Sequence, residues 1–330
     1  MRRASILLLL GATLAAAALL ALAVGAVGVS VGEILEVLGG GGDARTRSLI
    51  LGIRLPRVVL AVLVGGGLAV AGAVFQALLR NPLADPYILG VSGGAAVGAV
   101  SAVVLGGVTA GWSVTAGAMA GAVLAVILVL RIALATGRSL DSRILLLAGV
   151  IVGAFFNAVI LLLLTLADAE SFRSAVFWMM GRLWGAGWAG VAGMSVLLVP
   201  CLAVILALSR PLDLMAAGEE TAGYLGVPVE RMKLLSYLVT SLLVAAAVSV
   251  SGVIGFVGLI VPHAVRSQTG VRHRRLVPAA FVAGGLFLVW ADILARTLFP
   301  PWEMPIGGVT ALCGVPFFLF LIRKSPYRFG

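Results

Sequence analysis

The chain has 330 residues, of which 62% are hydrophobic and only 11% are charged, and its net charge is +10. Soluble domains are about half apolar and about one quarter charged, so this composition excludes a soluble protein and indicates an integral membrane protein. The basic residues lie mostly in short segments between apolar runs. No basic stripe is interleaved with aromatic residues, which argues against nucleic-acid binding.

The first apolar run begins after Met1-Arg2-Arg3 and continues to about Val29, and Ala21-Leu22-Ala23 offers a possible A-x-A cleavage site. In these features it resembles a secretory signal peptide. The apolar core of such a peptide spans only about 7–15 residues, however, and this run is longer. We therefore expect a first transmembrane helix that is retained.

Ten apolar segments approach the length of about 20 residues that a helix needs to cross the hydrocarbon core. They lie near residues 4–29, 56–79, 88–106, 110–131, 144–167, 189–208, 234–250, 253–266, 276–296 and 306–322. The eighth is short, and only residues 249–252 separate it from the seventh. The sequence thus predicts an all-α integral membrane fold of about ten transmembrane helices in one domain, residues 1–330.

The distribution of Lys and Arg predicts the orientation. With the N-terminus in the cytoplasm, cytoplasmic segments hold 16 basic residues and outer segments hold 7. The positive-inside rule then places both termini in the cytoplasm, and the chain in the cytoplasmic (inner) membrane as a multi-pass protein. The outer minority is large enough to need a reason, and it consists of Arg45, Arg47, Arg54, Arg57, Arg173, Arg182 and Arg296.

Glycines and prolines indicate how the helices are arranged. Glycines recur four residues apart at 90, 94 and 98, at 117 and 121, and at 149 and 153, a spacing that lets helices approach closely in lipid. Pro82, Pro86 and Pro262 break the apolar pattern, which is tolerated where protein or a water-filled cavity satisfies the backbone. Helices two to five and seven to ten could form an inverted repeat, as in many transporters.

The longest polar stretch, residues 209–233, falls on the predicted cytoplasmic side. Residues 216–225 are expected to form a short helix that Gly226 and Pro228 end. A connection this long inside a compact domain is usually functional. We therefore expect a rigid cytoplasmic surface on which a partner could push, although a plain connecting loop is the alternative.

Catalytic chemistry is not indicated. The only lysines, Lys233 and Lys324, lack the preceding glycine of a Walker A motif, and no HExxH or GxSxG pattern occurs. The two cysteines are isolated in apolar runs and predict neither a metal site nor a disulfide. Asp292 is the only acidic residue well inside a run, and Arg296 lies four residues later to neutralise it. We expect no enzyme activity, no cofactor and no proton relay, so if the protein transports a substrate actively, the energy would come from another subunit.

Eight stretches, in order along nearly the whole chain, resemble the FecCD permease family, the membrane subunits of ABC importers for iron–siderophore complexes, haem and cobalamin. They are RLPR at 54–57, GAVFQALLRNPLADPYILGVSGGA at 72–95, LLLAGV at 145–150, WMMGRLWG at 178–185, GEETAGYLGV at 218–227, GFVGLIVPHAVR at 255–266, ADILAR at 291–296 and PIGGVTALCGVPFF at 305–318. The resemblance implies ten helices, a homodimer with a central pathway, two copies of a cytoplasmic ATPase and an external or periplasmic binding protein.

The resemblance also assigns roles to outer arginines. In the cobalamin importer of this family, external arginines receive acidic residues of the binding protein, and the matching positions here are Arg54, Arg57 and Arg296. Arginine suits such docking because it stays charged and binds carboxylates with two parallel hydrogen bonds. Lipid anchoring or helix capping is the competing interpretation, and pairing with Asp292 is a further one for Arg296.

On the cytoplasmic side, the resemblance identifies residues 209–233 as the segment that couples to the ATPase. The expected coupling residues are Gly218, Glu219, Glu220, Ala222, Leu225 and Gly226. The family's cytoplasmic gate precedes the fifth helix, where Ser142 is the nearest match, flanked by Asp141 and Arg143. The relative carries neighbouring small hydroxyl residues there, so the flanking charges are a departure from its pattern.

The pathway is expected along the fifth and tenth helices, where Asn157, Thr165 and Thr310 are the main polar residues on nearly apolar walls. Such walls suit a bulky ligand handed over by another protein. The function inferred is the permease subunit of an ATP-driven importer for a metal chelate, iron–siderophore or haem. Cobalamin import is the alternative within the family, and a stand-alone secondary carrier or channel is the alternative outside it.

Overall fold

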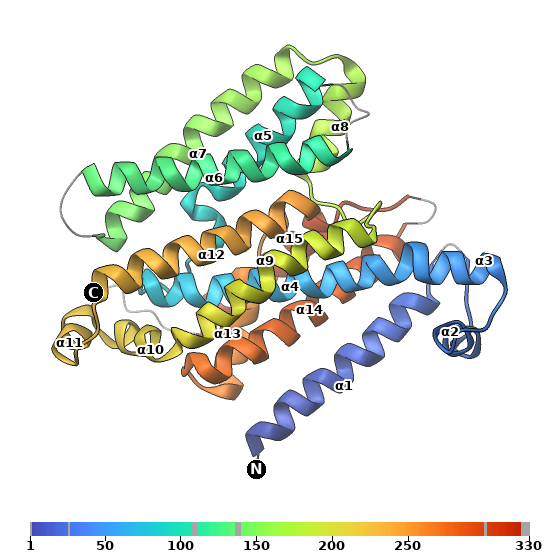
Figure 1. The fold of residues 1–330 in the computed structure, drawn as a ribbon, viewed down its shortest axis with the longest axis horizontal. Coiled ribbons are helices and arrows are strands. Elements are labelled where there is room, and N and C mark those ends of the chain that lie inside the picture. Colours follow the sequence, from blue (N-terminus) through green and yellow to red (C-terminus); the bar gives the residue numbers. More distant parts are fainter. Residues whose placement is uncertain (1, 26, 107–110, 136–139, 300–301, 325–330) are drawn as a thin grey trace.

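The structure is a computed structural model that describes residues 2–25, 27–106, 111–135, 140–299 and 302–324. All regular elements in these ranges are helices (Figure 1). In chain order they are α1 (Arg2–Ala23), α2 (Val31–Leu38), α3 (Ala44–Arg47), η1 (Ser48–Arg54), α4 (Leu55–Leu78), η2 (Pro86–Leu89), α5 (Val91–Gly106), α6 (Gly111–Ala135), α7 (Ser142–Thr165), α8 (Ala169–Met179), α9 (Trp188–Ala207), α10 (Ser209–Ala217), α11 (Glu219–Tyr224), α12 (Val229–Ser251), α13 (Val257–Thr269), α14 (His273–Thr297) and α15 (Ile306–Lys324).

The ten predicted apolar runs correspond to α1, α4, α5, α6, α7, α9, α12, α13, α14 and α15. Seven described helices are long and apolar enough to span a membrane, and α5 and α15 are shorter apolar helices. The predicted all-α membrane fold is therefore confirmed. Residues 26 and 110 of the predicted runs, and two of the predicted cytoplasmic arginines, Arg138 and Arg328, lie outside the described residues.

Three helices differ from the expected runs. The helix expected to begin near residue 56 begins at Ala44, because α3, the π-helical η1 and α4 are continuous over 35 residues. Two short helices outside the expected runs, α2 and α8, begin at capped residues. Ser30 and Glu33 form a reciprocal capping box before α2, and Asp168 caps α8.

The two ends of the bundle differ in what they carry. The helices α2, α3 and α8 lie at one end, and α10 and α11 lie at the other (Figure 1). We name these the outer end and the inner end, after the orientation that the basic residues predict. Groups that are far apart in the sequence meet at each end, so the ends are where the candidate sites lie.

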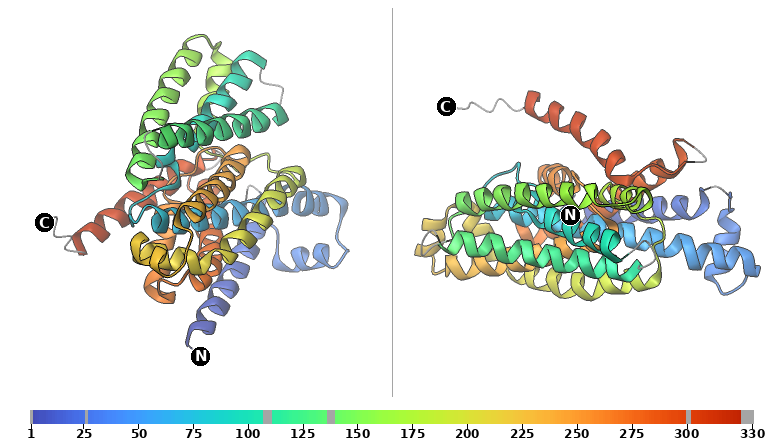
Figure 2. Two further views of the ribbon diagram at one scale, coloured as in Figure 1. Left: turned by 60° about the vertical axis from the view of Figure 1, so that its left-hand side comes forward. Right: turned by 90° about the horizontal axis from the view of Figure 1, so that it is seen from above.

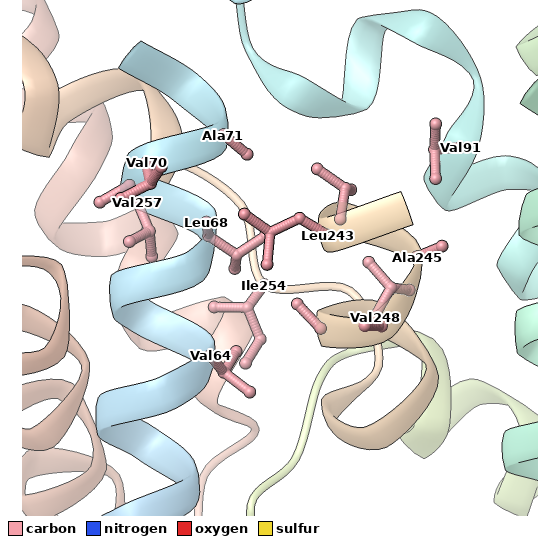
Figure 3. Close-up of a cluster of buried hydrophobic side chains, with 14 of the residues drawn as sticks. Val64, Leu68, Val70, Ala71, Val91, Leu243, Ala245, Val248, Ile254 and Val257 are labelled. Atoms are coloured by element: carbon pink, nitrogen blue, oxygen red, sulfur yellow. The ribbon is translucent and has the colours of Figure 1, made fainter. Parts of the chain in front are cut away.

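Helix α4 is the centre of the fold and is buried over almost its whole length. It packs against α12, α13 and α14, and Figure 3 shows Val64 and Leu68 of α4 facing Leu243 and Val248 of α12. A helix that is apolar on all sides is expected at such a position, because every face meets another helix. The other helices are therefore placed relative to α4.

The helix contacts agree with the predicted inverted repeat. Helix α4 packs against α13 and α14, and the matching helix of the second half, α12, packs against α5 and α6. The breaks that precede α5 and α13 also meet each other. The hydroxyl of Tyr87 donates to the carbonyl of Ile254 at 3.0 Å and accepts from its N–H at 3.1 Å. These bonds satisfy backbone groups that the broken helices leave free.

Close helix packing depends on the predicted glycines. A Cβ atom at Gly98 of α5 would lie 1.9 Å from the carbonyl oxygen of Gly117 of α6, and one at Gly94 would lie 2.3 Å from that of Gly121. Any side chain at these positions would push the two backbones apart. The interpretation of these spacings as packing is confirmed for α5 and α6.

Helices α7 and α15 leave apolar faces uncovered. The exposed large residues of α7 are Leu147, Val150, Ile151, Phe155, Leu161 and Leu162, and Leu312, Val315 and Leu319 are exposed on α15. In Figure 2, α15 extends away from the bundle, and α7 lies at the edge of the group formed with α5, α6 and α8.

Candidate functional site

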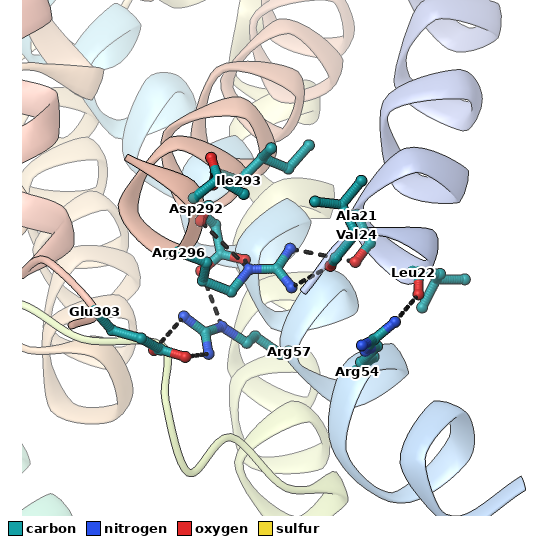
Figure 4. A network of polar contacts seen from close by, with 10 residues as sticks. Ala21, Leu22, Val24, Arg54, Arg57, Asp292, Ile293, Arg296 and Glu303 are labelled. Carbon is teal, nitrogen blue, oxygen red and sulfur yellow. Dashed lines mark hydrogen bonds and ion pairs between the residues drawn. The ribbon is translucent and has the colours of Figure 1, made fainter. Parts of the chain in front are cut away.

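The charged cluster at the outer end is an ion-pair network (Figure 4). Asp292 of α14 is buried, and Arg57 of α4 donates from Nε to its Oδ1 at 2.9 Å. Arg57 also contacts Glu303 through both terminal nitrogens, at 3.2 and 2.9 Å. Arg296 Nε lies 3.1 Å from Asp292 Oδ2, so the predicted pairing of these two residues is confirmed. The charge of this buried carboxylate is therefore balanced by two guanidinium groups, one hydrogen-bonded to Oδ1 and the other in ion-pair contact with Oδ2.

The same end of the bundle uses arginines to cap α1. Arg54 donates to the main-chain carbonyl oxygens of Leu22 at 2.6 Å and Ala23 at 3.2 Å, at the end of α1, and also to that of Val27, just beyond it. Arg296 donates to two more, at 3.0 Å to Val24 and 3.2 Å to Ala21. The last carbonyls of a helix have no partner within the helix and carry partial negative charge, so cationic donors stabilise them. The predicted alternative of helix capping thus describes Arg54 and Arg296.

This geometry corrects the expectation that Arg54 presents its charge to a partner. Only 6% of Arg54 is exposed, and its guanidinium points into the protein. The side chains of Arg57 and Arg296 are 13% and 8% exposed, and both are already paired with acids. The exposed basic residues of the outer end are instead Arg45, Arg47 and Arg173. Sequence reasoning counted these three but ranked them below the motif arginines.

At the inner end, α10 and α11 form a short helical pair. Gly218 joins them with a φ of +147°, which a residue with a side chain would adopt only under strain. The predicted helix over 216–225 is found as α11, which covers Glu219–Tyr224. Tyr224 and Leu225 are 84% and 63% exposed. Large apolar side chains at the protein–water boundary are typical of a contact surface.

The five predicted coupling residues that follow Gly218 divide into exposed ones and ones that turn toward the fold. Glu220, Leu225 and Gly226 are exposed, whereas Ala222 is fully buried against the rest of the fold. Glu219 turns toward the bundle, where it forms an ion pair with Lys233 and lies 3.5 Å from Arg80. Only part of the motif can therefore meet a partner. Tyr224 was absent from the predicted set, although its place in an otherwise polar stretch was a usable signal.

The predicted gate residues begin α7. Asp141 caps this helix by accepting from the N–H of Arg143 at 2.7 Å, and both side chains are exposed. Ser142 is buried, and its hydroxyl donates to the carbonyl of Leu78 at 3.0 Å. A cleft of about 610 Å³ lies beside them and includes Glu219 among its lining residues. The structure therefore brings the predicted gate and part of the coupling motif to one place.

The predicted pathway residues do not share one face. Asn157 and Thr165 are exposed on α7, and Asn157 lines a cleft of about 260 Å³ with Tyr87. The hydroxyl of Thr165 donates to the carbonyl of Leu162. Thr310 is fully buried and bonds to the carbonyl of Gly307, so it does not line an open surface, which corrects that part of the expectation. A single position in an apolar run does not show which side faces outward.

A contact between Asp213 and His273 connects α10 to α14. The Nδ1 atom of His273 lies 2.6 Å from Asp213 Oδ1, and the same oxygen accepts from the His273 N–H at 2.8 Å. Burial raises the pKa of the Asp213 carboxyl, but the bonds from His273 outweigh it and leave the pKa below its usual value. Among the described residues, no group of three or more His, Cys, Asp or Glu side chains could hold a metal ion.

Comparison with known proteins covers almost the whole chain. The model of the FecCD transport family matches residues 12–324. A cobalamin import permease, BtuC of Halobacterium salinarum, is 45% identical over 288 residues, which are 87% of this chain and 77% of that protein. A hemin transport permease, HmuU of Yersinia pestis, is 40% identical over 285 residues, 85% of each chain.

Solved structures agree with this comparison. A metal-chelate type ABC transporter in an inward-facing conformation matches with a TM-score of 0.88 and 34% identity, over 97% of this chain and 99% of that one. PsaBC from Streptococcus pneumoniae has a TM-score of 0.52 and 18% identity and shares the fold.

Proposed function

This chain belongs to the FecCD transport family and is the membrane-spanning permease subunit of an ABC importer, and from that premise we propose that it moves a bulky metal chelate, an iron–siderophore complex or haem. The observation that carries the proposal is the uncovered apolar wall of α7. A wall with Asn157 and Thr165 as its few polar residues offers no ion-binding site, but it can pass a large ligand without holding it.

A second copy of the chain would complete the pathway. Exposed apolar faces of a membrane protein contact either lipid or another subunit, and an identical subunit related by a two-fold axis would meet α7 and α15 with the same faces. The pathway would then lie between two copies of α7. Crosslinking of Phe155→Cys in membranes tests this arrangement, and a product of twice the subunit mass is the expected outcome. Cys313 is exposed, so Cys313→Ser provides the background.

The energy is proposed to come from two copies of a cytoplasmic ABC ATPase, so this chain itself would be non-catalytic and without a cofactor. The exposed Glu220, Tyr224 and Leu225 offer a surface for that partner. The outside alternative, a proton-driven carrier working alone, lacks a suitable acid, because the intramembrane Asp292 is bound by Arg57 and Arg296. Transport by the purified chain without any ATPase would contradict the proposal.

An external or periplasmic binding protein is proposed to deliver the substrate to the outer end. The exposed Arg45, Arg47 and Arg173 would attract its acidic residues, and Arg57 could join them by releasing Glu303. The multi-pass chain would lie in the cytoplasmic (inner) membrane with both termini inside. Reporter fusions at residue 330 test that orientation, and a reporter active only outside the cell would contradict it.

Cobalamin is the second candidate substrate, and one observation favours it. The relative from Halobacterium salinarum, 45% identical, is named a cobalamin importer. Calorimetric titration of the partner binding protein with ferric siderophores, haemin and cyanocobalamin distinguishes the two, and uptake by the reconstituted complex must follow the same order. Tight binding and uptake of cyanocobalamin alone would replace the iron-chelate proposal with its alternative.

A further inference from the structure

Lys233 is a buried cation that has no assigned role in docking, in the gate or in the transport pathway. It lies near the start of α12 and is 3% exposed, although its neighbours Arg231 and Glu230 are exposed to solvent. A buried ammonium group is unfavourable unless it is paired and hydrogen-bonded. The surroundings of this one side chain therefore show which groups the fold holds together here.

Three contacts satisfy the ammonium group of Lys233. Its Nζ donates to the carbonyl oxygen of Leu140 at 2.8 Å, immediately before α7. It also forms an ion pair with Glu219, the first residue of α11, and lies 3.9 Å from Glu230. One buried cation thus binds both the helix proposed to meet the ATPase and the residue that precedes the predicted gate.

The main chain of Leu140 is held from both sides. Its carbonyl accepts from Lys233, and its N–H donates to Glu230 Oε2 at 2.7 Å. The next two residues are also fixed, because Asp141 caps α7 and Ser142 bonds to the end of α4. The start of α7 is therefore placed by directional bonds, several of which involve charged groups and are correspondingly strong.

A parallel link from α11 is weaker. Arg80, beyond the end of α4, lies 3.5 Å from Glu219, but half of its side chain is exposed. Exposed ion pairs contribute little to coupling because water screens them. Lys233 is buried and lies between Glu219 and Leu140, so a displacement of Glu219 that left the ammonium group in place would leave a buried charge poorly compensated.

We infer that Lys233 is a positioning residue that transmits movement of α11 to the start of α7. When a partner shifts α11, the Glu219–Lys233 pair favours joint movement, and the bond from Lys233 carries that movement to Leu140 and the neighbouring gate residues. This inference rests on the proposed function, since it supposes that the partner acts on α11. It adds the side chain through which the action reaches the pathway.

The test compares Lys233→Met with Arg231→Met in the complete complex with its ATPase and binding protein. Methionine keeps much of the length of lysine and removes its charge, and Arg231 is an exposed cation two residues earlier on the same helix. The first measurement is hydrogen–deuterium exchange of the peptides that cover residues 140–146. We expect Lys233→Met to speed this exchange about tenfold or more, while Arg231→Met leaves it unchanged.

The second measurement is the number of substrate molecules transported per ATP hydrolysed in proteoliposomes. Lys233→Met should lower this ratio at least fivefold while the ATPase stays bound and hydrolyses ATP, and Lys233→Arg should restore part of it. Glu219→Gln should lower the ratio in the same direction, and the double variant Glu219→Gln with Lys233→Met should be no worse than Lys233→Met alone. Such non-additivity is expected of residues that act through one contact.

Each result decides a separate question. Unchanged exchange at residues 140–146 would overturn the link itself. Faster exchange with a normal transport ratio would show that Lys233 only stabilises the start of α7, and would overturn its part in transmission. If the wild-type complex transports no metal chelate, the proposed substrate is wrong. Exchange and the stimulation of ATP hydrolysis by the docked binding protein would still test Lys233 in that case.

Discussion

The two ends of the bundle carry charged motifs of similar appearance but use them differently. At the outer end, Arg54, Arg57 and Arg296 turn inward to carbonyl groups and acids. At the inner end, Glu219 turns inward, but the rest of its short helix leaves Glu220 and Tyr224 exposed. The motif charges at the outer end therefore make contacts within the protein, whereas some of those at the inner end are exposed and free to contact a partner. Burial and pairing distinguish the two cases.

The largest effect is expected from removing the acid at the centre of the outer network. Asp292→Ala would leave Arg57 and Arg296 without their shared buried partner, and breaking a buried pair costs about 3–5 kcal/mol. We expect a clearly lowered midpoint of thermal unfolding in detergent. Glu303→Gln is the control, because Glu303 is exposed and should change the midpoint little. Equal midpoints for the two variants would contradict a structural role for this end.

At the inner end, substitutions on the exposed surface of α11 and Leu225 should weaken partner binding without destabilising the fold. Tyr224→Ala with Leu225→Ala removes two exposed apolar side chains and should weaken ATPase binding by about 10-fold to 100-fold, or ~1.4–2.8 kcal/mol, without changing thermal stability. Binding of the purified ATPase to permease in nanodiscs measures this.

The two acids of α11 sharpen the contrast. Glu220→Arg should weaken ATPase binding only, because Glu220 is exposed. Glu219→Arg should also lower thermal stability, because it would place a second cation beside the buried Lys233. The same stability loss in both variants would show that α11 is not divided in this way.

A smaller effect is expected from exposed outer arginines. Arg45→Glu with Arg47→Glu should slow docking of the binding protein about threefold to tenfold at low salt, since rim charges act mainly on the association rate. Thermal stability should not change. Arg54→Ala should do the reverse, lowering stability because α1 loses one of its two capping arginines. Normal stability with lost docking for Arg54→Ala would restore its predicted role as a docking residue.

The smallest effect is expected at the contact between Asp213 of α10 and His273 of α14. The bonds from His273 lower the pKa of Asp213, so the folded state favours the ionised carboxylate. This stabilisation is present above the usual carboxyl pKa of about 3.9 and is lost as the pH falls through the lower pKa of the folded state. Asp213→Asn should therefore lower the unfolding midpoint slightly at pH 7. The difference from the wild type should shrink on acidification toward pH 3.

The sequence predicted segments better than it predicted sites. In the described part of the chain, each of the ten apolar runs contains a helix, because a long apolar segment in lipid must satisfy its backbone internally whatever its neighbours are. The pairing of Asp292 with Arg296 was also predictable, since residues four apart share one helix face. The burial of Thr310 was not, because it depends on what covers that face of α15.

By itself the sequence determined the membrane class, the helical segments and the family, because hydropathy and motifs are written along the chain. Only the tertiary structure decided which acid or carbonyl group each basic side chain contacts. Arg57 and Glu303 are 246 residues apart, and Lys233 and Leu140 are 93 apart. Helices in lipid associate through close backbone contacts and polar pairs rather than through burial of apolar surface, so spacing along the chain does not reveal these partners.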